Sequence, residues 1–340
     1  MDKKAVSIVV PTYNRRDRLG RVLAALDRQA DPTSFEAVIV DDGSTDGTTA
    51  WLENRAYRFA LRSIRQENGG PAKARNTGVY AASGTILLFL DDDVEPTDDL
   101  VGEHVRSHAR ERNIVVIGPL ASLPHYKQPW VTWEQDKLEA QYAAMLRGDW
   151  APTFRQFWTG NASVAREHVV AAGGFNVSYL RGEDVELGYR LHQMGLGFRF
   201  NPTARGLHHV ERSLDGWVKA HVSYGKIEPE LFSRLGKDQD LEVLGGNWSR
   251  LHPATRWLVE RCFDSPRNHA AASALLQRLL KLQEMTQTPI ASGKVCGALA
   301  NLCYWRGCAE AIGPDRARQI MRRGDELRLA TSGAHPRATQ

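Results

Sequence analysis

The sequence has few cysteines and no pattern that would join them. Its 340 residues include 4 cysteines, all in the last quarter of the chain, and no Cys-x-x-Cys pair. A small disulfide-held scaffold is excluded at this length, and a thiolate zinc site lacks its usual spacing. No stretch approaches the roughly 18 apolar residues of a membrane-spanning helix, and the first apolar run is too short for a signal peptide. We therefore expect a cytoplasmic protein without a transmembrane segment.

The two common phosphate-binding loops are absent as well. A dinucleotide-binding fold carries Gly-x-Gly-x-x-Gly after its first strand, but residues 11–15 read PTYNR. The Gly-x-x-x-x-Gly-Lys-Ser/Thr loop of the P-loop proteins is also missing. An α/β sheet that binds phosphates without either loop can use a metal ion.

The charges are unevenly distributed over an otherwise ordinary globular composition. Hydrophobic residues make up 42% and charged residues 25%, and the net charge is +4. Residues 261–340 hold 12 Lys/Arg against 6 Asp/Glu, which favours either a solvated surface or an anionic partner. Between Asp91 and Glu103 there are seven carboxylates and no basic residue. Such mutual repulsion is commonly tolerated because a divalent cation binds there.

Strand and helix patterns alternate through the first 90 residues. Apolar runs predict strands, and a helix follows from Pro71 to about Ala82; the strands are Val6–Val10, Phe35–Val40, Leu61–Arg65 and Thr85–Leu90. This alternation predicts a doubly wound α/β fold with a mostly parallel sheet. Ligands bind such sheets beyond the carboxyl ends of the strands, where the polar segments 12–14, 41–46 and 91–93 fall.

The rest of the chain divides into a mixed region and a helical one. Residues 104–225 indicate long loops and one clear helix near Val185–Met194. After about residue 227, helical patterns cover three segments, Leu258–Phe263, Ala271–Met285 and Val295–Trp305. We expect a domain over residues 1–225 and a C-terminal helical region over 226–335 packed on it. That packing should bury the leucines of the second helix, at positions 275, 276, 279, 280 and 282.

An ordered set of motifs resembles one enzyme family. The motifs are PTYNR (11–15), VDDGSTDGT (40–48), NGGPAKARNTG (68–78), FLDDDV (89–94), WTGNASVAREHVVAAGGF (158–175) and GEDVELGYRL (182–191). Together they resemble the inverting family 2 glycosyltransferases, which have the GT-A fold. The resemblance covers about residues 5–210.

The resemblance implies a nucleotide-sugar site at the strand ends. It places base and ribose contacts in the loop after the first strand and in the acids after the second strand. Further contacts near the base or ribose fall on the helix from Pro71 to about Ala82. The donor-site residues are Pro11, Thr12, Tyr13, Asp41, Asp42, Lys73, Arg75, Asp91, Asp92 and Asn161. A carboxylate suits a uracil or guanine N–H because it only accepts hydrogen bonds. A tight turn at 42–44 and an exposed helix face at 73–75 are the purely structural alternatives.

A metal site and a catalytic acid pair complete what the resemblance implies. Asp93 becomes a direct ligand, Asp91 a metal or ribose contact, and Asp92 points away by strand alternation. His208, six residues after Pro202, completes a site suited to Mn²⁺ or Mg²⁺, with His209 as the fallback.

Glu183 and Asp184 match the family's acid pair at a helix start. Inverting transfer needs one general base, and we expect Asp184 to be that base, with Glu183 supporting it or touching the acceptor. The alternative role of two acids in a first helical turn is to complement the helix dipole.

The expected activity is metal-dependent, inverting transfer of one sugar from a nucleotide-sugar, most simply a UDP-sugar, to an acceptor hydroxyl. The acceptor could be a glycan, a lipid-linked molecule or a small molecule; no nucleic acid is expected, and the basic C-terminal region could touch a membrane surface. Processive synthases of this family carry Gln-x-x-Arg-Trp, which Arg256-Trp257 does not complete.

A nucleotidyltransferase should show a Gly-rich basic loop after the first strand, which is absent. A non-catalytic glycan-binding or assembly module is the other alternative, favoured only if the acids at 91–93 or 183–184 were replaced.

Overall fold

The computed structural model describes residues 4–31, 34–123, 125–179, 181–234, 236, 238–286 and 292–332. The chain divides into two compact units: the first contains Met1–Tyr126 and Gln135–Val210, the second Lys127–Glu134 and Glu211–Gln340. The domain boundary expected between residues 225 and 226 falls inside helix α8 (Leu214–Arg234), and the division into domains stays a prediction.

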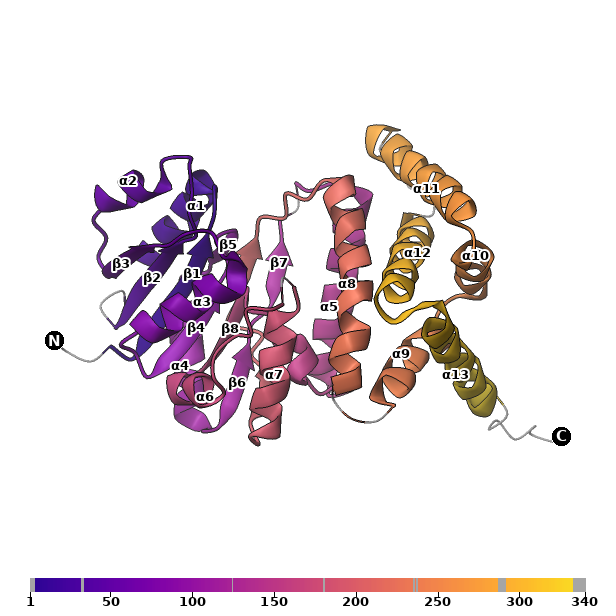
Figure 1. Ribbon diagram of the computed structural model, residues 1–340. Coiled ribbons are helices and arrows are strands. Elements are labelled where there is room, and N and C mark those ends of the chain that lie inside the picture. Colours follow the sequence, from indigo (N-terminus) through magenta and orange to yellow (C-terminus); the bar gives the residue numbers. More distant parts are fainter. Residues whose placement is uncertain are drawn as a thin grey trace. The chain divides into compact units, whose positions relative to one another are not determined.

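The first unit is built on a mixed sheet, whose first four main strands are parallel as the alternating pattern predicts (Figure 1). Its strands are β1 (Val6–Thr12), β2 (Phe35–Asp41), β3 (Ala60–Arg65), β4 (Ile86–Leu90), β6 (Ile114–Ile117), β8 (Asn161–Ala165) and β9 (Gly197–Phe200). They lie in the order β3-β2-β1-β4-β8-β6-β9, and β8 is antiparallel to both β4 and β6. The parallel strands β1, β2, β3 and β4 bring their carboxyl ends to one edge.

Helices cover both faces of this sheet because alternate strand residues point to opposite sides. Strand β1 illustrates the pattern: Val6, Ile8 and Val10 join one buried cluster, and Val9 joins the other. Helices α1 (Arg16–Asp27), α2 (Thr48–Glu53) and α4 (Leu100–Arg110) pack on the first face. Helices α3 (Gly70–Ala81), α6 (Arg166–Ala171) and α7 (Glu183–Gln193) pack on the second.

A small second sheet lies beside the acidic segment. Its strands β5 (Val94–Pro96), β10 (Gly206–His208) and β7 (Leu120–Ser122) lie in the order β5-β10-β7. Strand β10 runs antiparallel to β5, with His208 opposite Val94. The pairing therefore brings residue 208 next to the strand that follows Asp93.

Two long helices were not expected. The expectation of loops over most of 104–225 was wrong for α5 (Pro129–Arg147) and for the start of α8. The apolar residues of α5 do not form one stripe, and α8 contains Gly216, Gly225 and Pro229, which normally argue against a helix. Packing outweighs that propensity: a Cβ at Gly225 would overlap the backbone of Tyr304, so glycine allows α8 to approach α12 (Ser292–Ile312) closely.

The second unit is helical, as the sequence predicts. Besides α8 and α12 it contains α9 (Gln239–Ser249), α10 (Pro253–Phe263), α11 (Pro266–Thr286) and α13 (Pro314–Ser332). All four cysteines are buried and free. The expected burial of the α11 leucines was wrong for Leu275, Leu279 and Leu282, which are exposed, because the helix turns a different face toward its neighbours.

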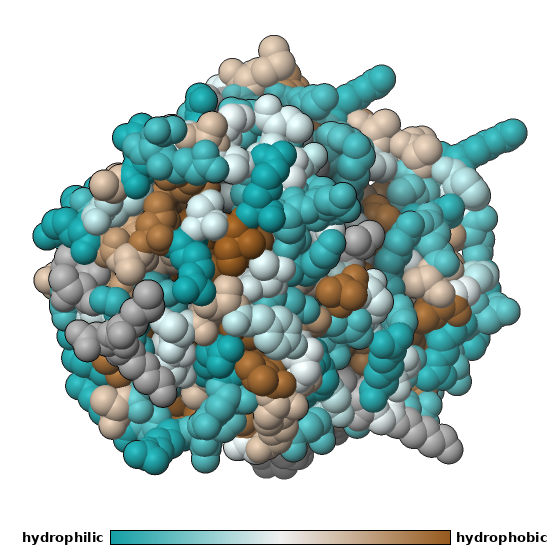
Figure 2. Space-filling view, turned by 60° about the vertical axis from the view of Figure 1, so that its left-hand side comes forward, coloured by the Kyte–Doolittle hydropathy of each residue, from teal (hydrophilic) through white to brown (hydrophobic). Residues whose placement is uncertain are grey.

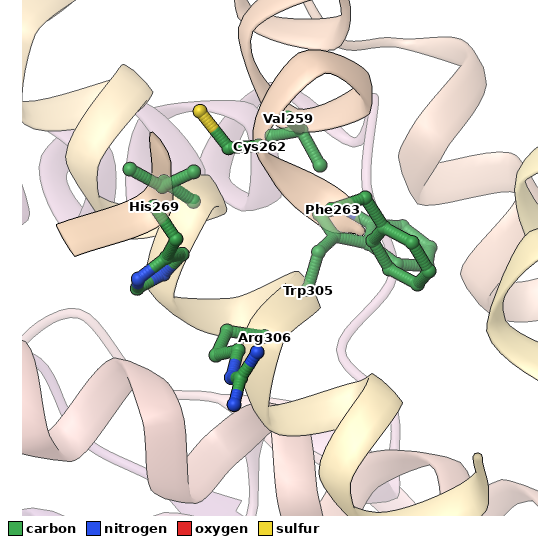
Figure 3. A pocket seen from close by; sticks show the side chains of 7 residues that line it. Val259, Cys262, Phe263, His269, Trp305 and Arg306 are labelled. Atoms are coloured by element: carbon green, nitrogen blue, oxygen red, sulfur yellow. The ribbon is translucent and has the colours of Figure 1, made fainter. Parts of the chain in front are cut away.

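A pocket in this unit is too small and too apolar for a nucleotide-sugar. It has a volume of about 190 Å³, below the roughly 300–1,000 Å³ of most ligand sites. Figure 3 shows its lining, which consists of Val259, Cys262, Phe263, His269, Leu302, Trp305 and Arg306.

The surface and the helices of the described residues bear on whether the chain could cross a membrane. The face in Figure 2 is mostly hydrophilic, with hydrophobic areas that are separate from one another. None of the helices in the described residues is both long enough and apolar enough to span a bilayer.

Candidate active site

The acids at the end of β2 organise the surrounding loops. Asp41 is fully buried and accepts hydrogen bonds from the Ser44 amide at 2.8 Å and from the Thr49 hydroxyl, which fixes the turn that follows β2. Asp42 is also buried, and its own amide donates to the Thr12 carbonyl at 2.9 Å. These bonds tie the loops after β1 and β2 together at the predicted edge.

Asp42 also holds the start of α3. Its carboxylate accepts from the amides of Gly69 at 3.0 Å and Gly70 at 2.8 Å, and from the Gln66 side chain at 2.7 Å. The negative charge thus sits at a helix N-terminus, where backbone N–H groups stabilise it. Lys73 lies exposed one turn further along the helix.

An open groove lies beside Asp42. Its volume is about 740 Å³, and it is lined by Gly43, Arg65, Gln66, Glu67 and Asn68. Tyr13, in the loop after β1, exposes about half of its side chain, 48%. A flat exposed ring and an accepting carboxylate are the groups that can bind a planar base by stacking and by hydrogen bonding.

Asp92 is the most buried of the three acids after β4, which lie in a turn where the Val94 amide donates to the Asp91 carbonyl at 3.1 Å. Asp92 is buried and accepts from the Thr12 hydroxyl at 2.8 Å and from Arg15 at 2.9 Å. Burial raises the pKa of Asp92 to about 6, although Arg15 and Thr12 act in the opposite direction. Both carboxylate oxygens of Asp92 are therefore used to hold the loop after β1. Sequence reasoning quoted Arg15 in the PTYNR motif but gave it no partner.

Asp93 lies beside His208, the histidine that the family resemblance implies for the metal site. The two side chains are 3.5 Å apart, between His208 Nε2 and an Asp93 oxygen. Arg15 at 3.2 Å and Arg18 at 3.7 Å also face Asp93. Burial alone would raise the pKa of Asp93, but the hydrogen bond and charge of His208 and the two arginines outweigh it, so that pKa is lowered.

His209 faces a different acid. Its Nε2 lies 3.1 Å from a Glu95 oxygen, and its amide donates to the Asp93 carbonyl at 2.8 Å. The side chains of residues 208 and 209 thus alternate along the strand end, and only His208 points to Asp93.

Asp91 turns toward Arg75 rather than toward His208. Arg75 is 5% exposed, and its guanidinium bridges two acids: Nη2 lies 2.8 Å from Asp91, and Nη1 lies 2.8 Å from Glu183. The buried Nε of Arg75 has no hydrogen-bond partner among the described residues. The bridge links α3, the end of β4 and the start of α7.

Two of the three predicted metal ligands therefore lie together. Within the residues that the structure describes, no group of three or more His, Cys, Asp or Glu side chains converges on one point. Asp93 and His208 offer one carboxylate and one imidazole, a donor set that fits Mn²⁺ or Mg²⁺ when phosphate oxygens and waters complete the coordination.

Asp184 follows Glu183 in the first turn of α7 and is partly buried. One of its oxygens accepts from the Val185 amide at 2.8 Å. Burial and the neighbouring Glu183 charge raise the pKa of Asp184 to about 7, while Arg75 acts in the opposite direction. A carboxylate that ionises near neutral pH is suited to taking a proton.

Asn161, expected near the donor sugar, is used inside the fold. It is 1% exposed, and its amide nitrogen donates to the carbonyls of Pro119 at 3.2 Å and Ala204 at 2.8 Å. Its oxygen lies 3.0 Å from His104 Nε2. Because the amide nitrogen donates to two carbonyls, the oxygen is the acceptor, and His104 carries its proton on Nε2.

The rest of this buried network was missed by sequence reasoning. His104 Nδ1 and His108 Nε2 each lie 2.8 Å from the Ser163 hydroxyl. Burial lowers the pKa of both imidazoles to about 4, so both are neutral at pH 7. The two histidines, four residues apart on α4, are the sequence signal that could have placed them on one helix face.

Comparison with known proteins gives the family. The family model described as glycosyl transferase family 2 matches residues 7–169. The uncharacterized glycosyltransferase YfnE of Bacillus subtilis is 32% identical, in a match that covers 64% of this chain and 69% of YfnE. A validoxylamine A glucosyltransferase of Streptomyces hygroscopicus subsp. limoneus is 31% identical, over 67% of this chain and 58% of that enzyme. The chain thus spans less than two thirds of the latter relative.

Two solved structures share the fold at low identity. The mannosyltransferase PcManGT of Pyrobaculum calidifontis, in complex with GDP-Man and Mn²⁺, matches with a TM-score of 0.53 and 19% identity, over 96% of this chain and 87% of that one. Residues 1–349 of S. aureus TarS, in complex with UDP-GlcNAc, match with a TM-score of 0.54 and 15% identity, over 91% and 92%. The motifs, the mixed sheet and these matches agree. The chain belongs to glycosyl transferase family 2 and is a glycosyltransferase with the GT-A fold.

Proposed function

We propose that this enzyme transfers one sugar from a UDP-sugar to an acceptor hydroxyl, with inversion at the anomeric carbon and with the help of a divalent cation. The structural relatives support this proposal, because one is a complex with UDP-GlcNAc and another with GDP-Man and Mn²⁺. We assign the chemistry to the first unit, since every candidate residue from Pro11 to His208 lies in it.

The acid pair at the start of α7 carries the proposal. Asp184 takes the proton from the acceptor hydroxyl while the hydroxyl oxygen attacks the anomeric carbon. The bond from that carbon to the diphosphate breaks in the same step, and the nucleoside diphosphate leaves. Glu183 is held by Arg75 at 2.8 Å, and it therefore orients the start of the helix rather than competing for the proton. No covalent intermediate on the enzyme is needed.

The donor would lie between the groove and the acids after β4. Tyr13 and Asp42 would hold the base, with Pro11, Thr12 and Lys73 around it. A carboxylate has about four lone-pair sites, and Asp42 uses three of them within the fold, so one remains for a base N–H. Asp93 and His208 would hold the cation, which when bound would neutralise charge on the departing diphosphate, while Asp91 stays paired with Arg75.

The decisive experiment is a panel of UDP-, GDP- and dTDP-sugars tested with and without Mn²⁺. We expect donor turnover only with a UDP-sugar and a divalent cation, and an anomeric configuration in the product opposite to that of the donor. Retention of configuration would contradict single displacement, and full turnover in a chelator would contradict the metal requirement.

The proposed base predicts the pH dependence. Asp184 must be ionised to accept a proton, and its pKa is raised to about 7. We expect kcat/KM to fall about tenfold per pH unit below that value and to level off above it. A rate profile from pH 5 to 9 at saturating Mn²⁺ measures this, and a profile flat down to pH 5 would exclude Asp184 as the base.

The two histidines should differ in metal dependence. Only His208 lies beside Asp93, whereas His209 faces Glu95. We expect His208→Ala to raise the Mn²⁺ concentration for half-maximal activity by at least about tenfold, since losing even an indirect metal contact costs that much. His209→Ala is the matched control and should change it little. The reverse order would mean that the ligand is the neighbouring residue.

A further inference from the structure

Helix α11 (Pro266–Thr286) buries polar residues and exposes leucines, the opposite of what is expected for a helix that packs only within its own unit. Ser273, Leu280 and Gln283 are its buried residues. Leu275, Leu279 and Leu282, by contrast, are 59%, 39% and 49% exposed. Spacings of four and three residues put these three leucines on one side of the helix. The helix thus buries a serine and a glutamine while three leucines stay in contact with water. This arrangement indicates that a binding partner outside the unit covers the leucines.

The charged side chains beside the three exposed leucines are all positive. Arg267, Arg278 and Lys281 are exposed along one side of the leucines, and none forms an ion pair with a described residue. The acid of the helix, Glu284, lies about half a turn from the leucines, near the buried face, and is partly buried. The exposed arc of α11 is therefore apolar and cationic.

This combination selects among possible occupants. A second copy of the helix docked on the exposed leucines would bring cations against cations, which costs free energy. A polyanion in solution would use the cations but leave the leucines in water. An anionic bilayer uses both, because the leucines enter the acyl boundary while the cations stay among the lipid phosphates. Residues 261–340 as a whole carry 12 Lys/Arg against 6 Asp/Glu, which adds attraction of the same sign.

We propose that α11 is a peripheral membrane-docking surface that lies flat on an anionic lipid bilayer, with Leu275, Leu279 and Leu282 facing the acyl chains. We call these leucines with Arg267, Arg278 and Lys281 the α11 face. The inference concerns where the enzyme works, and it holds whichever sugar donor the active site uses.

The test is co-sedimentation of the full-length protein with vesicles of phosphatidylcholine alone or mixed with phosphatidylglycerol. We expect binding to the mixed vesicles, weaker at high salt, and little binding to phosphatidylcholine alone. The double variant Leu275→Gln/Leu282→Gln should weaken vesicle binding by at least about tenfold, since each leucine loses its apolar insertion. Arg278→Gln/Lys281→Gln should weaken it by about tenfold, because each cation near an anionic surface contributes.

Leu329→Gln is the matched control. Leu329 is a leucine on α13 that is 66% exposed but lies outside the α11 face, so its replacement should leave vesicle binding unchanged. Thermal unfolding of each variant checks that the fold is kept. The proposal is overturned if the wild-type protein binds neither kind of vesicle, or if Leu329→Gln weakens vesicle binding as much as the α11 variants do. It is also overturned if light scattering shows a dimer that Leu275→Gln/Leu282→Gln dissociates, because the face would then join two copies.

Discussion

Replacing Asp184 with asparagine should lower sugar transfer by about 10²–10⁴-fold while leaving donor binding nearly unchanged. Asparagine keeps the shape of aspartate and can still accept from the Val185 amide, but it cannot take the acceptor's proton. Stability should hold, because burial and Glu183 already disfavour the charged form of Asp184, whose pKa is raised. Transfer kinetics and donor binding by calorimetry measure the two effects separately.

Glu183→Gln is the control for this variant. The carboxylate of Glu183 pairs with buried Arg75 at 2.8 Å, so its loss should cost stability more than Asp184→Asn does, and transfer activity less. If Glu183→Gln is inactive while Asp184→Asn transfers sugar normally, the two residues have exchanged roles. If both variants stay active, the base lies elsewhere in the site.

The parts of the site that the sequence predicts are those set by local geometry. Continuous apolar runs identified the buried strands, and the parallel arrangement brought the segments after β1, β2 and β4 to one edge. Alternation along an extended chain does not describe the acids after β4, because residues 91–94 form a turn in which Asp92 and Asp93 share Arg15 and Asp91 pairs with Arg75. The prediction of the sheet edge needed only the period of a strand and the direction of its neighbours.

The parts that the sequence could not predict depend on contacts between distant residues. Arg75 and Glu183 are 108 positions apart, and nothing local to either residue indicates the ion pair that joins them. Asn161 sits in a motif that implied a donor contact, yet three distant partners fix its side chain inside the fold. The exposure of Leu275 was not predicted for a related reason. An apolar periodicity identifies an apolar helix face, but it does not show which other part of the molecule packs against that face.

Replacing Arg75 with methionine should destabilise the first unit by about 3 kcal/mol and also abolish most transfer activity. The guanidinium bridges Asp91 and Glu183, and the side chain of Glu183 is only 9% exposed. Methionine fills the volume but leaves a buried carboxylate without its partner, and the loss of one member of a buried pair is what makes such changes costly. Activity falls because Asp91 and the first turn of α7 lose the contact that holds them together, and because Asp184 loses a nearby positive charge that lowers its pKa.

Denaturant unfolding of wild type, Arg75→Met, Glu183→Gln and the double variant measures this coupling. We expect the double variant to be less destabilised than the sum of the single variants, since removing the stranded carboxylate relieves the cost of the missing arginine. Arg75→Lys keeps the charge but can reach only one acid well, so its stability should lie between wild type and Arg75→Met. Additive losses, or an Arg75→Met variant as stable as wild type, would show that the bridge between Asp91 and Glu183 does not hold the two halves of the site together in solution.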